Sequence, residues 1–365
     1  PMCEFWSEGF GFNSAFSCIE GTSIAHVKGA PVVAAEAFTA DSREAWKKYP
    51  GDMKNQGDWA FCMGINRLVY HTFAHKPYGD SHRPGVTMGP YGVHWDRGQT
   101  WWPMAEGYHK YVTRCQYVLS QGKPVADILY LAPEGAPHVF RPPSSALSGT
   151  DFMPDKKGYS FDGCSPNYLI NNATVKDGKV VFPGGASYNI MVLPQVRAMT
   201  PELLEKVKIL AEAGATIIGN PPEKSPSLSD YPECDVNVKK LVYEIWGKEE
   251  IPLLITSRNL GKGNILWGKI INNSHRGIHG DPDSLTIYPD YDITRSILEV
   301  KGILPDFNSP DGNIRYTHRS LQDKEIYFVS NVTGLDIADE CFFRDGSPAA
   351  EFWNAVTGEI RPVKV

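Results

Sequence analysis

Apolar and polar positions alternate over residues 1–124 in a way that predicts strands and helices in turn. Three short runs rich in apolar and β-branched residues predict strands: MCEFW (2–6), PVVAAE (31–36) and RLVYHTF (67–73). Helical spacing predicts three helices: residues 13–28, closed by Gly29, residues around 59–66, and residues 104–121, ended by Gly122 and Pro124. Alternating strands and helices build parallel sheets.

A parallel sheet of this kind suits part of a (β/α)8 barrel. A complete barrel needs about 250 residues, whereas this segment offers three strands. We therefore expect residues 1–124 to be the C-terminal part of a catalytic barrel whose first half lies upstream of Pro1. The chain begins without an initiator Met, which fits a fragment.

The pattern changes near Val125. Residues 125–305 predict an α/β domain of amidotransferase-like or flavodoxin-like type, because parallel strands alternate with a helix that Thr200 caps, Pro201 opens and Gly214 ends. Its predicted strands are residues 125–133, 188–194, 215–219 and 264–270. From about Ile314, period-two alternation predicts antiparallel strands, so residues 306–365 are expected to be the start of a β-sandwich.

Composition excludes several functional classes. The 365 residues are 42% hydrophobic and carry a net charge of −6, so no basic face for nucleic acid is expected. No run of 18 apolar residues predicts a membrane span. The seven cysteines form no CxxC pair, and HTFAH (71–75) is not HExxH, which argues against zinc. The chain lacks GxSxG, GxGxxG and GxxxxGK[ST], so no nucleotide cofactor is predicted.

Candidate catalytic residues stand where the three barrel strands end, since loops converge there. The first strand offers Glu4 and Glu8, the second Glu36, and the third His71 and His75. Two carboxylates in one pocket are the minimum for glycoside hydrolysis, one as acid and one as base or nucleophile. The alternative is that each glutamate is a solvated or salt-bridged residue.

The loop over residues 74–103 strengthens the catalytic interpretation. It is rich in glycine and proline and combines aromatic rings with hydrogen-bonding groups, which suits sugars, whose apolar faces are edged by hydroxyls. The predicted substrate-binding residues are His71, His75, Tyr91, Trp95, Arg97, Trp101 and Trp102. Trp101 and Trp102 directly precede a helix, so one of them could only anchor it.

Several long phrases resemble glycoside hydrolase family 106, the α-L-rhamnosidases. The similarity is carried by GAPVVAAEAFTA, RLVYHTFAHKPYGD, PGVTMGPYGVHWDRGQTWWPMAEGYHKYVTRCQYVL and VADILYLAPEGAPHVFRPP. The resemblance implies an exo-acting, inverting bacterial enzyme, periplasmic or secreted, that removes terminal α-L-rhamnose with glutamate acid and base and with calcium. By this resemblance, Glu36 matches one catalytic glutamate of the family, and either Glu4 or, as the alternative, Glu8 matches the second. The resemblance does not identify the calcium ligands.

Two alternatives remain open. One is an exo-glycosidase of the β-galactosidase type that combines a barrel with an amidotransferase-like domain. The other is a carbohydrate-binding protein that lacks the chemistry. The expected partner is a carbohydrate, and the α/β domain is a candidate contact for a homo-oligomer.

Overall fold

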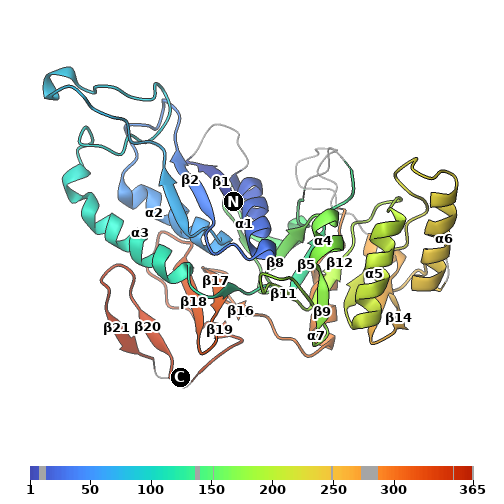
Figure 1. Cartoon of the computed structure of the whole chain (residues 1–365). Coiled ribbons are helices and arrows are strands. Elements are labelled where there is room, and N and C mark those ends of the chain that lie inside the picture. The colour runs from blue at the N-terminus through green and yellow to red at the C-terminus, as the bar shows by residue number, and fades with distance from the viewer. Residues whose placement is uncertain are drawn as a thin grey trace.

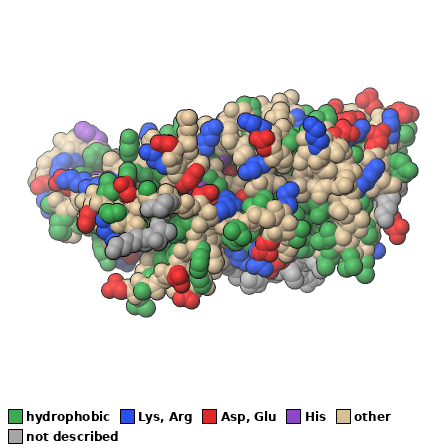
Figure 2. Space-filling model, turned by 90° about the horizontal axis from the view of Figure 1, so that it is seen from below, with side chains coloured by type: hydrophobic (Ala, Val, Ile, Leu, Met, Phe, Trp, Pro, Cys, Tyr) green, Lys and Arg blue, Asp and Glu red, His purple; other side chains and the backbone are tan. Residues whose placement is uncertain are grey.

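The computed structural model describes residues 1–7, 14–135, 140–150, 152–247, 250–272, 287–347 and 349–363. A small parallel sheet with its helices lies at one end of an elongated molecule, and a larger sheet lies at the other end (Figure 1). Short antiparallel strands from the C-terminal part lie beneath the first sheet. The face seen from below carries basic and acidic side chains interspersed with hydrophobic ones (Figure 2).

The first sheet is parallel, in the order β1-β2-β3, as the alternation of strands and helices predicts. Its strands are β1 (Met2–Trp6), β2 (Ala34–Thr39) and β3 (Arg67–Tyr70). The helices that follow them are α1 (Ser14–Lys28), α2 (Pro50–Met63) and α3 (Ala105–Leu119), with 3-10 turns η1 (Asp80–His82) and η2 (Trp102–Met104) before α3.

Several predicted boundaries in this layer were wrong. Helix α2 begins at Pro50, not near Trp59, because proline is preorganised for the first helical turn. It ends at Gly64, which takes the left-handed conformation with φ 106°. Strand β2 begins at Ala34 and continues to Thr39, three residues beyond the predicted end, so Glu36 lies inside the strand rather than at its end. Strand β3 ends at Tyr70 rather than at residue 73.

The second sheet has the order β14-β15-β13-β12-β5-β8 and is parallel except for the β14–β15 pair. Its strands are β5 (Ile128–Leu131), β8 (Phe161–Cys164), β12 (Ile190–Val192), β13 (Thr216–Ile218), β14 (Thr256–Leu260) and β15 (Gly263–Trp267). Its helices are α4 (Pro166–Asn172), α5 (Pro201–Ala213), α6 (Glu233–Trp246) and α7 (Tyr291–Val300). The Thr200 hydroxyl caps α5 and Gly214 ends it, as predicted.

Smaller elements connect and extend these layers. Around the second sheet lie β6 (Leu147–Gly149), β7 (Pro154–Lys156), β9 (Thr174–Lys176), β10 (Lys179–Val181), β11 (Ser187–Tyr188), η3 (Ser144–Ala146) and η4 (Lys269–Asn272). The antiparallel elements are β4 (Lys123–Pro124), β16 (Phe307–Asn308), β17 (Ile314–Ser320), β18 (Glu325–Asn331), β19 (Phe342–Phe343), β20 (Glu351–Trp353) and β21 (Ile360–Pro362). Antiparallel pairing in this last segment confirms the period-two prediction.

A buried polar joint ties the two sheets together. On α1, Nδ1 of His26 lies 2.9 Å from Oδ1 of Asp162 on β8. The hydroxyl of Tyr188 donates to Oδ2 of the same carboxylate at 2.9 Å, and the backbone N–H of Gly163 donates to Ser23 at 3.0 Å. One hydrophobic cluster runs from the first sheet into the second, so the layers share a core.

The described helices include none with the length and apolar character that crossing a bilayer requires. All seven cysteines are free thiols, and six of them are buried, as expected of small core residues.

Candidate active site

Two of the predicted catalytic glutamates are neighbours across β1 and β2. Glu4 and Glu36 are register partners in the parallel ladder, and Val69 on β3 pairs with Glu36 on the other side. Partners in a ladder point to the same face of a sheet. Because neighbouring strands lie about 4.8 Å apart, the two carboxylates rise from adjacent points of one surface.

The two faces of this sheet differ in their surroundings. The alternate positions of β1 and β2 pack against the helices and are fully or almost fully buried: Cys3, Phe5, Ala35 and Ala37. The opposite face is open, since 32% of the Glu36 side chain and 44% of Val69 are exposed. Glu4 and Glu36 therefore stand on the solvent-accessible face.

Two side chains contact or approach the Glu36 carboxylate. The Thr39 hydroxyl donates a hydrogen bond of 2.6 Å to Oε1. Nε2 of His71, directly after β3, lies 4.0 Å from the same oxygen, and only 13% of its side chain is exposed. The Thr39 hydrogen bond therefore fixes the orientation of the carboxylate, and the His71 imidazole lies beside it without a direct hydrogen bond.

The loop between β3 and α3 brings Tyr91 to the strand ends. The Tyr91 ring meets the Trp6 ring edge to face, with centroids 6.0 Å apart, and Trp6 pairs with Thr39 across the sheet. The N–H of Gly92 donates to the carbonyl of Ala40 at 2.8 Å. Tyr91 is thus placed at the carboxyl ends of β1 and β2, with Trp6 beside it.

Trp95 and Trp101 are core residues rather than open platforms. Trp95 is 1% exposed and stacks on Tyr70, with ring centroids 4.0 Å apart. Trp101 is 9% exposed, packs edge-on against Trp95 and donates its indole N–H to the carbonyl of Lys48 at 3.0 Å. Because these rings are covered by protein, they support the loop from behind, which corrects the prediction that they face a sugar.

The remaining predicted residues lie further out. Trp102 is partly buried and packs against the His109 ring on α3. Arg97 is exposed and contacts other residues of its own loop. Its guanidinium donates to the carbonyl of Tyr78 at 3.2 Å and lies 3.7 Å from the carboxylate of Asp80. His75 is exposed on the same loop. Glu8 lies outside the described residues.

Two residues of this region escaped the sequence analysis. Thr39 follows Glu36 by three positions, and the two-residue period of a strand assigns it to the opposite face. Trp46, on the loop after β2, is 44% exposed and stacks on His94 with ring centroids 4.2 Å apart. Burial lowers the pKa of His94, which favours a neutral ring beneath the indole. The sequence feature that could have identified Trp46 as a candidate is its position in the loop after a predicted strand.

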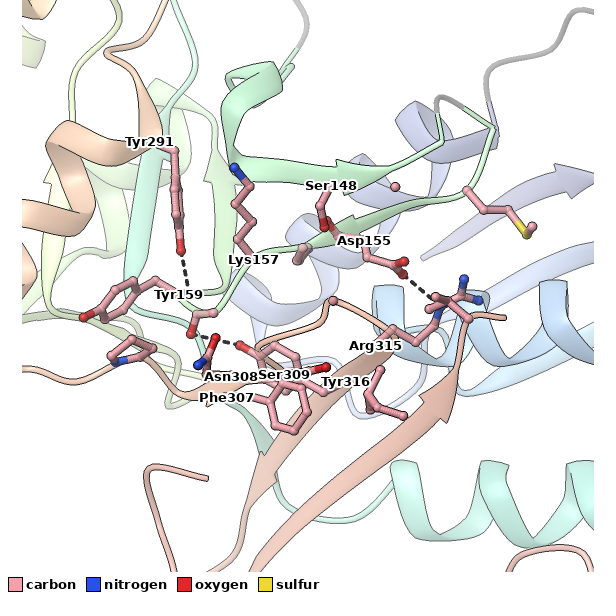
Figure 3. A pocket seen from close by; sticks show the side chains of 18 of the residues that line it. Ser148, Asp155, Lys157, Tyr159, Tyr291, Phe307, Asn308, Ser309, Arg315 and Tyr316 are labelled. Atoms are coloured by element: carbon pink, nitrogen blue, oxygen red, sulfur yellow. Dashed lines mark hydrogen bonds and ion pairs between the residues drawn. The ribbon is translucent and has the colours of Figure 1, made fainter. Parts of the chain in front are cut away.

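Two hollows occur elsewhere, at junctions between layers. One, of about 410 Å³, lies beside the buried ion pair in which Nε of Arg315 is 3.0 Å from Oδ1 of Asp155 (Figure 3). Figure 3 also shows Tyr291 and Phe307 around this hollow. The other, of about 1050 Å³, is lined by residues that include Asp127 and Arg344. Neither of these two hollows is lined by Glu4 or Glu36, which stand on the open face of the first sheet.

Comparison with known proteins identifies the family. The family model of glycoside hydrolase 106, described as alpha-L-rhamnosidase, matches residues 1–365. The chain belongs to this family. A protein of Formosa agariphila named "Putative beta-glucuronidase" is 31% identical over 365 residues, which cover 99% of this chain and 27% of that protein. The structure of a rhamnosidase from Novosphingobium sp. PP1Y matches with a TM-score of 0.79 and 27% identity, over 100% of this chain and 32% of that one.

This family member therefore spans about a third or less of the length of the relatives that it matches. The match to a rhamnosidase structure over the whole chain establishes a rhamnosidase-like mixed α/β fold. Together these matches place the chain among glycoside hydrolases.

The resemblance implies calcium, and one group of residues tests the fit. Among the described residues, Asp306, His318 and Asp345 offer ligand atoms within 4.8 Å of one another. Both ring nitrogens of His318 already face carboxylates, with Nδ1 2.8 Å from Asp306 and Nε2 2.9 Å from Glu325. The Arg344 guanidinium lies 3.3 Å from Asp306. Because calcium takes six to eight oxygen ligands, a group in which an imidazole and a guanidinium already pair with the carboxylates does not fit it.

Proposed function

We propose that the protein containing this chain is an exo-acting glycoside hydrolase that removes terminal α-L-rhamnose, with Glu36 and Glu4 as its catalytic pair. Family membership supports the class of reaction. The observation that carries the proposal is the register pairing of the two glutamates on the open face of a parallel sheet. Paired carboxylates are what acid–base cleavage of a glycosidic bond requires.

The open face also supports a partial barrel. Sheets made only of parallel strands are normally covered on both faces, yet helices cover one face of β1–β3. We propose that these strands are the C-terminal part of a (β/α)8 barrel, the further strands of which belong to the longer protein. Loops at the carboxyl ends of barrel strands form the active site, and Thr39, His71 and Tyr91 all lie there.

In the proposed reaction the two carboxylates divide the proton transfers. One glutamic acid protonates the leaving glycosidic oxygen, while the other carboxylate removes a proton from the attacking water. Glu36 suits the base, because the Thr39 hydroxyl donates to it and His71 approaches the same oxygen. Glu4 is then the acid. The exposed faces of Trp46 and Tyr91 are suited to the apolar side of a sugar ring.

Substitution of each glutamate tests this assignment in the full-length protein. Glu36→Gln and Glu4→Gln should each lower kcat on p-nitrophenyl α-L-rhamnoside by about 10²–10⁴-fold, because proton transfer contributes that much. Glu205→Gln on the exposed side of α5 is the matched control and should be neutral. Near-normal turnover in Glu36→Gln would remove this residue from the mechanism.

The stereochemistry is a second readout. An inverting enzyme releases β-L-rhamnose first, which proton NMR detects before the anomers equilibrate. Initial release of α-L-rhamnose would instead indicate retention, for which the two carboxyl groups must lie about 5–5.5 Å apart.

A second candidate substrate class comes from the Formosa agariphila relative, named for beta-glucuronidase activity. Assays with an aryl α-L-rhamnoside, an aryl β-D-glucuronide and an aryl β-D-galactoside distinguish rhamnosidase, glucuronidase and galactosidase activity. Binding of sugar without turnover of any of them would favour a carbohydrate-binding protein.

A further inference from the structure

An irregularity in the β1–β2 ladder lies next to the proposed catalytic pair. Phe5 pairs with Ala37, but the next residue of β1, Trp6, pairs with Thr39. Phe38 is therefore an extra residue on β2, a β-bulge. It has φ 61°, in the left-handed region that a bulky residue rarely adopts.

Packing holds Phe38 in this unfavourable conformation. Its side chain is fully buried and meets the Phe5 ring edge to face, with centroids 5.0 Å apart and planes at 87°. The Trp95 ring lies 6.2 Å away. A Cβ added to Gly57 of α2 would stand 3.3 Å from the Phe38 ring, so α2 approaches closely because this position is glycine.

The bulge changes the direction of Thr39. In a regular strand, residues three apart point to opposite faces, and Thr39 would then point away from the Glu36 side. With Phe38 inserted, the Thr39 hydroxyl instead reaches Oε1 of Glu36 at 2.6 Å. The backbone carbonyl of Thr39 accepts the N–H of Ser7 at 2.8 Å, and the residue is 2% exposed. Both ends of the hydrogen bond are thus held by the sheet.

We propose that Thr39 is a positioning residue for catalysis, re-aimed by the Phe38 bulge so that its hydroxyl holds the Glu36 carboxylate toward the attacking water. This inference rests on the proposed function. Strained backbone of this kind persists where the surrounding structure imposes it, and it is concentrated at functional sites. Among the residues that the structure describes, Glu4 on β1 and His71 after β3 are the charged or titratable groups found beside Glu36.

Three variants of the full-length enzyme separate positioning from structure. Thr39→Val removes the hydroxyl with little change of shape, Thr39→Ser keeps it, and Thr22→Val removes an equally buried hydroxyl on α1. Thr39→Val should lower kcat on p-nitrophenyl α-L-rhamnoside by about tenfold to a hundredfold, the value of a hydrogen bond to a charged group, with little change in KM. The acidic limb of the kcat profile should move to higher pH. Thr39→Ser should retain most of the kcat of the unsubstituted enzyme, and Thr22→Val should leave kcat unchanged.

Each outcome decides the inference. Normal kcat and an unshifted pH profile in Thr39→Val, with Glu36→Gln inactive, would overturn the role of Thr39 and leave the proposed function standing. An active Glu36→Gln variant would overturn the proposed function first. If Thr39→Val unfolds, Thr39→Ser and Thr39→Ala give the same comparison, and equal kcat in these two variants would also overturn the role of Thr39.

Discussion

At the scale of single residues, the surroundings of a carboxylate decide its chemistry more than its position in the sequence does. Asp155 on β7 shows this away from the candidate site. Burial raises its pKa to about 6, although the neighbouring Arg315 opposes the shift. The Asp155 side chain is 14% exposed, so solvent screens it little.

This shift predicts a pH dependence of stability. Because the folded state binds the Asp155 proton more tightly than the unfolded state, stability falls as pH rises from about 4 to about 6, by about 3 kcal/mol from this group. Asp155→Asn should remove that contribution. We expect the stability of the native protein relative to Asp155→Asn to fall by this amount between about pH 4 and pH 7 in urea denaturation. If the difference in stability between the native protein and Asp155→Asn does not change with pH, the raised pKa of Asp155 is contradicted.

At the scale of elements, the strong local signals were reliable and the weak ones were not. The Thr200–Pro201 start and Gly214 end of α5 were predicted correctly because caps depend on neighbouring backbone groups. The start of α2 was missed, since its first half contains glycine and polar residues. Gln56, Gly57 and Asp58 are buried there by tertiary packing, which no local period reveals.

The end of α1 offers a prediction at this scale. Gly29 has φ 71°, and a Cβ built on it would overlap the backbone of Gly184. Gly302 has a similar φ of 75°, but a Cβ there would meet none of the described atoms within 4 Å. Gly302→Ala should therefore cost about 1–2 kcal/mol for the left-handed backbone alone.

Gly29→Ala should cost about 1–3 kcal/mol more, from overpacking. Urea denaturation of both variants measures the difference. Equal losses would show that α1 and the β10–β11 turn can separate without penalty.

At the scale of the whole molecule, a few buried polar contacts join the layers. Asp162 on β8 accepts from Tyr188 and pairs with His26 on α1, all within the shared interior. The helix predicted over residues 13–28 includes His26, but no local pattern reveals its partner, because residues 26 and 162 are distant in the chain. The proposed homo-oligomer contact through the second sheet stays a prediction.

Removing the carboxylate at this joint should be costly. Asp162→Ala removes the hydrogen-bond partner of both His26 and Tyr188 and should lower the free energy of unfolding by about 2–6 kcal/mol, at about 1–3 kcal/mol for each buried polar group left unpaired. Tyr188→Phe removes one hydrogen bond and should cost about 1 kcal/mol. Differential scanning calorimetry compares the two. A loss in Asp162→Ala no larger than in Tyr188→Phe would show that the joint contributes little.

The amino-acid sequence by itself determined the parallel βα order, the antiparallel C-terminal strands, the glycosidase family and the choice of Glu4 and Glu36 as candidates on two successive strands. These follow from local periodicity, caps and long shared phrases. Only the tertiary structure decided that the two glutamates are register partners, that Trp95 and Trp101 are buried, and that Thr39 turns toward Glu36. Burial and register depend on contacts between distant segments, and a single inserted residue such as Phe38 reverses the face that a strand pattern predicts.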